Sequence, residues 1–248
     1  MIIKKNPLTS RERVLKALGH QEPDRVPFNL SLTEDIYHRL REHLGLPPEP
    51  GKAVGYWTIV RVGLNPPENG SPSREKEGLL FDEWGIGRIK IDRLDGGYYF
   101  EIVHHPLEGA EIEEIEEYPW PDPHDPGRVD GLREKVLRIR RETDKAIMGG
   151  FSTPIWEGAY YLYGFENWLM DLTVKPEITG RILDKVTDLA TAFTCVGLEA
   201  AGDLVDIVRL SGEDLGMQHG PMISNQMFDE IVKPRFHRYW KAVKEFAL

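Results

Sequence analysis

The sequence predicts an α/β fold in which parallel strands alternate with helices. The clearest unit lies near the carboxyl end, where an apolar segment at 204–210 precedes a polar loop and an amphipathic helix that ends near residue 246. A similar unit comes before it, with an apolar strand at 146–150 and helical segments over 156–172. Strands and helices that alternate along a chain are typical of a parallel sheet covered by helices. The length of 248 residues suits one sizeable domain over 1–248.

The amino-terminal part predicts a helix, a strand and a second helix. Thr9 and Glu12 match a capping box and predict a helix over 11–18, since the threonine hydroxyl can accept the Glu12 amide while the glutamate bonds back. The apolar segment 25–30 predicts a first strand, although it contains a proline. Apolar residues at four-residue spacing predict a helix over 33–44 that ends at a glycine.

An irregular excursion is expected at about 47–127. Residues 47–78 are rich in proline and glycine and predict a long loop. The segments 81–93 and 98–104 alternate enough to predict a β-hairpin through an Asp-Gly-Gly turn. Residues 106–127 are acidic and proline-rich, which is typical of a solvated linker.

The second half predicts longer helices over 132–142 and 176–201, the latter begun by a proline and marked by one apolar stripe. The strand at 204–210 is apolar on both faces apart from Asp206 and Arg209, which is the pattern of a covered strand. Only three segments are expected as parallel strands, against eight in a closed (β/α)8 barrel. We therefore expect a free sheet edge and association into homo-oligomers.

Composition excludes several classes of protein. The net charge of −10, from 31 basic against 41 acidic residues, argues against a nucleic-acid partner. Cys195 is the one cysteine and cannot form an internal disulfide, so a reducing cytoplasm is the expected location. No apolar run reaches the roughly 20 residues of a membrane span.

Adjacent carboxylates follow the strand at 204–210. Glu213 and Asp214 would repel each other, which raises one pKa and favours a catalytic acid or hydrogen-bonding role. The alternative is that one of them accepts amides from the loop or from a helix N-terminus. Gln218 and His219 lie in the same loop and are candidates for orienting a substrate, although His219 is as readily a solvated side chain.

A second candidate segment follows the strand at 146–150. Trp156 and Glu157 occupy the equivalent position at the carboxyl end of that strand, so both are candidate substrate-binding residues. The alternative for Glu157 is a structural cap or ion pair. Ser224 is better interpreted as the N-cap of the last helix than as a nucleophile, because no histidine and aspartate partners accompany it. The sequence predicts no metal site.

Four segments in the same order and spacing carry a family resemblance. Residues 212–216 read Gly-Glu-Asp-Leu-Gly and precede Gln218, Gly220 and Pro234. The other segments are Ser10-Arg11-Glu12-Arg13-Val14 with Pro23-Asp24-Arg25-Val26-Pro27, Trp156-Glu157-Gly158, and Ala201-Gly202-Asp203. The chain resembles the uroporphyrinogen decarboxylase superfamily. The resemblance implies a (β/α)8 TIM barrel of that type, incomplete here because the C-terminal strands are missing.

Departures from the decarboxylase pattern favour another branch of the superfamily. The decarboxylases carry an Arg-Gln-Ala-Gly-Arg segment whose arginines hold the substrate carboxylates, whereas this chain reads Phe28-Asn29-Leu30-Ser31-Leu32. They also have a tyrosine at the position of Pro154 and a serine at that of Glu213. A site that loses paired arginines and gains a carboxylate suits a polyanionic tetrapyrrole poorly.

The Glu213-Asp214-Leu215-Gly216 run is more similar to the cobalamin-dependent methyltransferases. That resemblance implies methyl transfer between a small methylated donor, a corrinoid protein and a thiol or pterin acceptor. Thiol-methylating members use zinc held by a His-x-Cys pair and a later cysteine, and no His-x-Cys occurs in the 248 residues. In the family this pair lies on later strands, so its absence here leaves zinc and a partner-bound corrinoid as expectations for a longer protein. The alternatives are uroporphyrinogen decarboxylation for porphyrin biosynthesis, or a non-catalytic binding module or inactive fragment.

Overall fold

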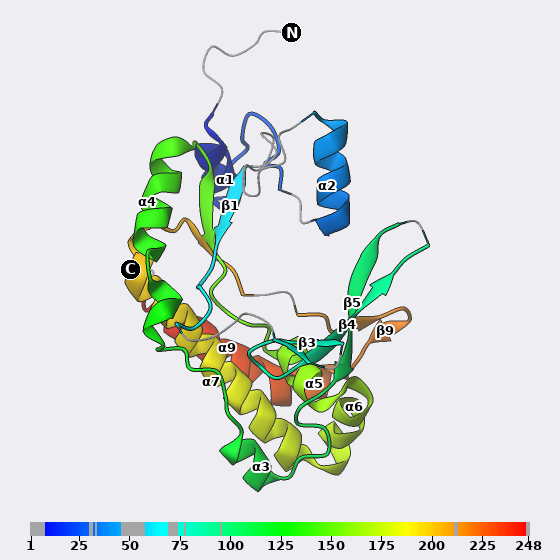
Figure 1. Cartoon of the computed structure of the whole chain (residues 1–248). Coiled ribbons are helices and arrows are strands. Elements are labelled where there is room, and N and C mark those ends of the chain that lie inside the picture. Colours follow the sequence, from blue (N-terminus) through cyan, green and yellow to red (C-terminus); the bar gives the residue numbers. More distant parts are fainter. Residues whose placement is uncertain are drawn as a thin grey trace.

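A three-stranded parallel sheet forms the centre of the computed structural model, in the order β1-β6-β7. The structure describes residues 8–29, 32, 34–45, 58–68, 74–76, 78–94, 96–210 and 213–246. Helices α4 and α7 lie along one side of the sheet, while α2 and the β4–β5 hairpin lie on the other side of the molecule (Figure 1). These elements are β1 (Ile59–Val62), β6 (Ala146–Gly149), β7 (Ile207–Val208), α4 (Leu132–Glu142), α7 (Pro176–Ala201), α2 (Glu34–His43), β4 (Gly87–Asp92) and β5 (Tyr98–His104).

The central strand β6 is buried along its whole length, as expected for a parallel strand covered on both faces. In the parallel register, Met148 pairs with Arg61 of β1 and with Ile207 of β7. The side chain of Ile147 joins the hydrophobic core that α4 and α7 cover. The prediction of parallel strands alternating with helices is therefore confirmed.

The first predicted helix is confirmed as α1 (Ser10–Leu18), and its capping box forms as expected. The Thr9 side chain accepts the amide of Glu12, and the Glu12 carboxylate accepts the amide of Thr9. The predicted second helix is α2, and the segment that follows it at 46–57 lies outside the described residues.

The predicted strand at 25–30 is wrong for the residues that the structure describes, 25–29. These residues form no strand, and the Phe28 carbonyl accepts the backbone amide and the hydroxyl of Thr58. Pro27 has no N–H to donate, so the apolar pattern alone does not produce a ladder.

The prediction of a loop over 47–78 is wrong at residues 59–62, because these residues form the strand β1. Four residues pair with β6, which lies more than 80 positions later in the chain. The strand is short and flanked by prolines and glycines, so its local pattern is that of a loop. Pairing with a distant strand makes it part of the sheet.

The predicted hairpin is confirmed by the antiparallel pairing of β4 with β5, although the segment 81–93 is not one strand. The Asp82 carboxylate accepts the amides of Trp84 and Ile86 and turns the chain between β3 and β4. Asp95, in the predicted hairpin turn, lies outside the described residues. The hairpin belongs to a four-stranded antiparallel sheet with β2 (Arg74–Lys76) and β3 (Leu79–Phe81).

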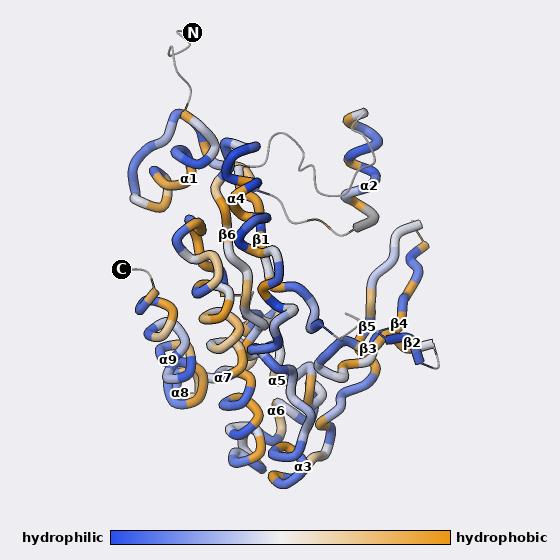
Figure 2. The backbone as a smooth tube through the Cα atoms, turned by 60° about the vertical axis from the view of Figure 1, so that its left-hand side comes forward, coloured by the Kyte–Doolittle hydropathy of each residue, from blue (hydrophilic) through white to orange (hydrophobic). Residues whose placement is uncertain are grey.

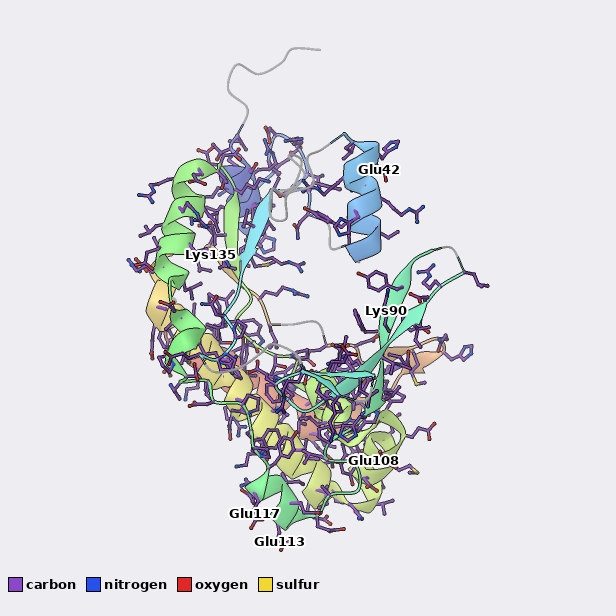
Figure 3. All side chains as sticks on the ribbon, in the orientation of Figure 1. Glu42, Lys90, Glu108, Glu113, Glu117 and Lys135 are labelled. Atoms are coloured by element: carbon purple, nitrogen blue, oxygen red, sulfur yellow. The ribbon has the colours of Figure 1, made fainter. Side chains whose placement is uncertain are left out.

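The solvated linker predicted at 106–127 is wrong, because it contains the helix α3 (Ile112–Glu117), which packs against α7. Ile115 is fully buried in the core. Glu113 and Glu117 point outward from α3 at the surface of the molecule (Figure 3). Glu113 and Glu117 thus form the outer face of a short amphipathic helix, whereas Glu116 forms ion pairs with Arg181 and Lys185 of α7.

The remaining predicted helices are present, and Ser224 is the N-cap whose hydroxyl accepts the Met227 amide. Hydrophobic residues recur along α7 as orange bands in Figure 2, as the predicted apolar stripe requires. None of the helices in the described ranges is long and apolar enough to cross a membrane. The other elements are α5 (Trp156–Tyr163), α6 (Phe165–Val174), β8 (Gly216–Met217), β9 (Gly220–Pro221), α8 (Asn225–Met227), α9 (Lys233–Lys244), a π-helix (Phe228–Val232) and two 3-10 helices (Pro126–Val129, Gly202–Leu204).

Candidate functional site

A cavity of about 430 Å³ lies at the carboxyl ends of β1 and β6. The loop 63–67 after β1 and the loop 150–154 after β6 form much of its lining. Residues 82–84, Arg128 and Phe193 complete it. In parallel α/β folds this end of the sheet is where ligands bind, because the loops that carry functional side chains converge there.

The arginine of this cavity is already neutralised. The Arg128 guanidinium donates two hydrogen bonds to the Glu83 carboxylate, and its side chain is 4% exposed. It also lies over the ring of Phe193, 5.0 Å from the centroid. Sequence reasoning missed Arg128, because it follows a segment interpreted as linker. The positive charge of Arg128 is thus paired with the Glu83 carboxylate and stacked on the Phe193 ring.

Glu213 binds the N-terminus of α5. Its carboxylate accepts the backbone amides of Ile155 at 2.5 Å, Trp156 at 2.7 Å and Glu157 at 3.4 Å. Burial raises the pKa of Glu213 to about 7, and the three N–H donors oppose that rise. The structure thus matches the alternative interpretation in which one of the adjacent carboxylates accepts amides of a helix N-terminus.

Glu157 and Asp214 lie close to Glu213. Burial, and next the negative charge of Asp214, raise the pKa of Glu157, whereas the Tyr160 hydroxyl and the Asp214 amide bond to it and lower the pKa. The Asp214 carboxylate is exposed and accepts the amide of Gly216 at 2.9 Å. The structure therefore brings three predicted carboxylates together, beyond the ends of β6 and β7. Their chemical role stays a prediction.

The other predicted residues lie elsewhere. Trp156 is completely buried and packs edge-on against Trp168, with ring centroids 5.4 Å apart. The expectation that it contacts substrate is therefore wrong, because α5 directs this side chain into the core. Gln218 and His219 are exposed at the turn between β8 and β9, and neither lines the cavity.

No three histidine, cysteine, aspartate or glutamate side chains converge on a metal-binding arrangement in the described part of the chain. Cys195 lies half-buried on α7, and burial raises the pKa of its thiol. The zinc site that the methyltransferase resemblance implies is not tested by these residues and stays a prediction.

Comparison with known proteins identifies the family. The model of the family "Uroporphyrinogen decarboxylase (URO-D)" matches residues 101–247, which is more than half of the chain. The chain belongs to the uroporphyrinogen decarboxylase family. This URO-D family member is 28% identical over 139 residues to the uroporphyrinogen decarboxylase of Alkalilimnicola ehrlichii. That alignment covers 53% of this chain and spans 37% of the length of the curated relative.

A solved structure has the same type of fold. The methyltransferase from Methanosarcina mazei superimposes with a TM-score of 0.55 at 17% sequence identity, over 95% of this chain and 67% of that chain. This similarity shows the fold alone. The URO-D family member thus has an incomplete α/β barrel-type fold with three parallel strands in the described residues, as the resemblance implied.

Proposed function

We propose that this URO-D family member is an enzyme that transfers a methyl group between a small methylated donor, a corrinoid carried by a partner protein, and a thiol or pterin acceptor. The observation that carries the proposal is the charge at the carboxyl ends of the strands. Arg128 is bound to Glu83 and Arg88 to Asp82, while three carboxylates gather next to the cavity. Among the described residues, the cavity lining therefore offers no unpaired cation to the many carboxylates of a tetrapyrrole.

The cavity lining supports the same choice. Pro154 lines the cavity at the position where the decarboxylases carry a tyrosine. At the position of their serine, this chain has Glu213, whose carboxylate accepts a backbone amide at the N-terminus of α5. Neither group that the resemblance assigns to decarboxylation is therefore available, and a decarboxylase is the less suitable alternative.

The proposed transfer to a thiol needs a group that accepts a proton. With a methylcorrinoid as the methyl donor, the methyl group would pass to the thiol sulfur, the electron pair of the carbon–cobalt bond would stay on the corrinoid, and the thiol proton would go to a base. We assign that base to Glu157, because it lies beside Glu213 and three residues after Pro154 of the cavity lining, and because burial and the Asp214 charge raise the pKa of its carboxylate. Asp214 favours protonation of Glu157, and Glu213 is a positioning residue that fixes the start of α5.

The test compares two reactions of the purified chain. With methylcobalamin and 2-mercaptoethanol, we expect loss of the methylcobalamin absorbance above the buffer rate. Glu157→Gln should slow this loss by about 100-fold or more, the usual contribution of a general base. Glu166→Gln, on the exposed face of α6, is the matched control and should leave the rate unchanged.

With uroporphyrinogen, we expect no decarboxylation. Formation of coproporphyrinogen above the uncatalysed rate would overturn the proposal and favour the decarboxylase. Loss of neither substrate would favour the third alternative, a binding module or an inactive fragment, which turnover of either substrate would exclude.

A further inference from the structure

Two arginines share one face of the parallel sheet. Arg61 of β1 is in register with Met148 of β6 and with Ile207 of β7. The ladder continues for one residue beyond the strands, since the Gly150 amide bonds to the Val62 carbonyl and the Arg209 amide to the Gly149 carbonyl, each at 2.9 Å. Arg209 is therefore two rows beyond Arg61. Because side chains alternate between faces along a strand, both arginines are on the same face.

That face is the one opposite the helices. Val62, Ile147 and Val208 are in the alternate rows, and all three pack in the core that α4 and α7 cover. Leu210, the residue after Arg209, packs there too. Arg61 is exposed and Arg209 is half-buried, which agrees with a position on the face away from α4 and α7, where Met148 between the two rows is itself buried.

Two glycines leave the sheet surface open beside Arg209. Gly63 and Gly150 are in the same row as Arg209, so that row has no other side chain. A Cβ atom built on Gly150 would have one neighbour within 4 Å, the Val62 carbonyl oxygen at 3.9 Å. Both glycines also line the cavity at the strand ends. The row of the sheet that carries Arg209 thus reaches the cavity, although neither arginine is part of the lining.

The two guanidinium groups also differ from the other arginines at this end of the sheet. Arg88 and Arg128 are bound to carboxylates, whereas neither Arg61 nor Arg209 forms a side-chain hydrogen bond or ion pair with any residue that the structure describes. Strands about 4.8 Å apart and residues about 3.3 Å apart along a strand put the two Cα atoms roughly 12 Å from each other. Two long, flexible side chains can meet a ligand across that span.

We propose that Arg61 and Arg209 bind an anionic group, a carboxylate, sulfonate or phosphate, of a small molecule on this face of the sheet. A guanidinium matches the geometry of such oxyanions and can bind them through two parallel hydrogen bonds. With a net charge of −10, the rest of the protein repels anions, so the pair is a local exception. That the group belongs to the methyl acceptor or donor rests on the proposed function, whereas the anion site itself does not.

Binding of simple anions to the whole chain tests the site without any turnover. Inorganic phosphate, sulfate and succinate would be titrated by calorimetry at low ionic strength, with neutral succinamide as the uncharged counterpart of succinate. We expect at least one of the three anions to bind and succinamide not to bind. The anion that binds most tightly identifies the class of the natural group.

Variants attribute the binding to the two side chains. Arg61→Gln and Arg209→Gln should each weaken binding about tenfold or more, since each removes a charge-assisted hydrogen-bond donor. Arg138→Gln, an exposed arginine on α4, changes the net charge equally and should leave the affinity unchanged. Thermal unfolding checks that each variant is folded, and Arg61→Lys replaces Arg61→Gln if the latter is not.

Absence of anion binding, or equal weakening by Arg138→Gln, would overturn the anion site. A site that binds anions in a chain that transfers no methyl group would leave this inference standing and remove only the proposed function.

Discussion

Two carboxylates, Asp206 before β7 and Glu213 after it, have pKa values that are shifted in opposite directions. The Asp206 carboxylate accepts the Ile147 amide at 2.8 Å and is bound by two cations, Arg11 and Arg140. Burial raises its pKa, but the amide and the two arginines outweigh burial and lower it. Glu213 has amides but no cation among its partners, and burial raises its pKa to about 7. The difference follows from whether a positive charge accompanies the carboxylate.

Replacing Asp206 by alanine should lower the free energy of unfolding by about 2–4 kcal/mol at pH 7, since it leaves a buried amide and two arginines without their acceptor. Because the folded-state pKa is lowered, this stabilisation is present above the unfolded-state pKa and is lost as the pH falls through the folded-state pKa. Urea unfolding at pH 7 and pH 3 measures both effects. Asp203→Ala, which removes an exposed ion pair with Arg133, should cost much less. An equal loss in both variants would contradict this assignment.

For Glu213 the pH dependence has the opposite sign. Its folded-state pKa, about 7 against an ordinary 4.5, means that the folded chain binds the proton more tightly between these two values. The free energy of unfolding should therefore fall as the pH rises from 4.5 to 7, by up to about 3 kcal/mol from this residue. Glu213→Gln cannot titrate, so its stability should change less over that range. If the variant shows the same decline as the parent chain in urea titrations, Glu213 is not the source.

At the scale of elements, the loop after β6 is fixed by close packing against α7. The ring of Phe151, which lines the cavity, lies in a slot formed by Gly149 of β6 and Gly197 of α7. A side chain at either glycine would overlap that ring. The two glycines thus let the helix and the strand approach from both sides, and they position the cavity wall.

Gly197→Ala should therefore destabilise the protein by about 1–3 kcal/mol, the usual cost of overpacking, in spite of the better helix propensity of alanine. Gly180→Ala in the same helix is the matched control, because a Cβ atom there would have only ordinary contact, 3.6 Å from Nη2 of Arg235. The control should be neutral or stabilising by up to about 1 kcal/mol. Thermal unfolding of both variants gives the comparison, and a stabilised Gly197→Ala would show that the slot is loose.

At the scale of the whole molecule, β7 is an edge strand of the described sheet. A groove of about 510 Å³ runs beside it, lined by residues 205–208 and by apolar side chains that include Leu198, Trp240 and Val243. An edge that offers unpaired backbone groups next to an apolar groove favours pairing with another chain.

We expect the purified chain to associate as its concentration rises, as the sequence already suggested. Ile207→Lys puts a charge on this edge strand and should shift the equilibrium toward monomer in sedimentation velocity experiments. Ile207→Val is the control and should associate like the parent chain. A parent chain that stays monomeric at high concentration would show that the edge is protected.

The sequence by itself determined the features that depend on neighbouring residues. The capping box of Thr9, the N-cap at Ser224, the stripe of α7 and the apolar strand β6 are local patterns, and the structure contains all of them. The family motifs placed Glu157, Glu213 and Asp214 after strands, which was enough to predict that they lie near one another.

Tertiary structure alone decided the features that depend on distant residues. Residues 59–62 became a strand because β6 pairs with them, and Glu213 found its partners at the start of α5, more than 50 positions earlier. Trp156 turned inward because of where α5 packs, and the sheet register put Arg61 and Arg209 on one face. A local pattern indicates which residues can be buried or paired. Which residue each of them contacts depends on how segments that are distant in the sequence pack together.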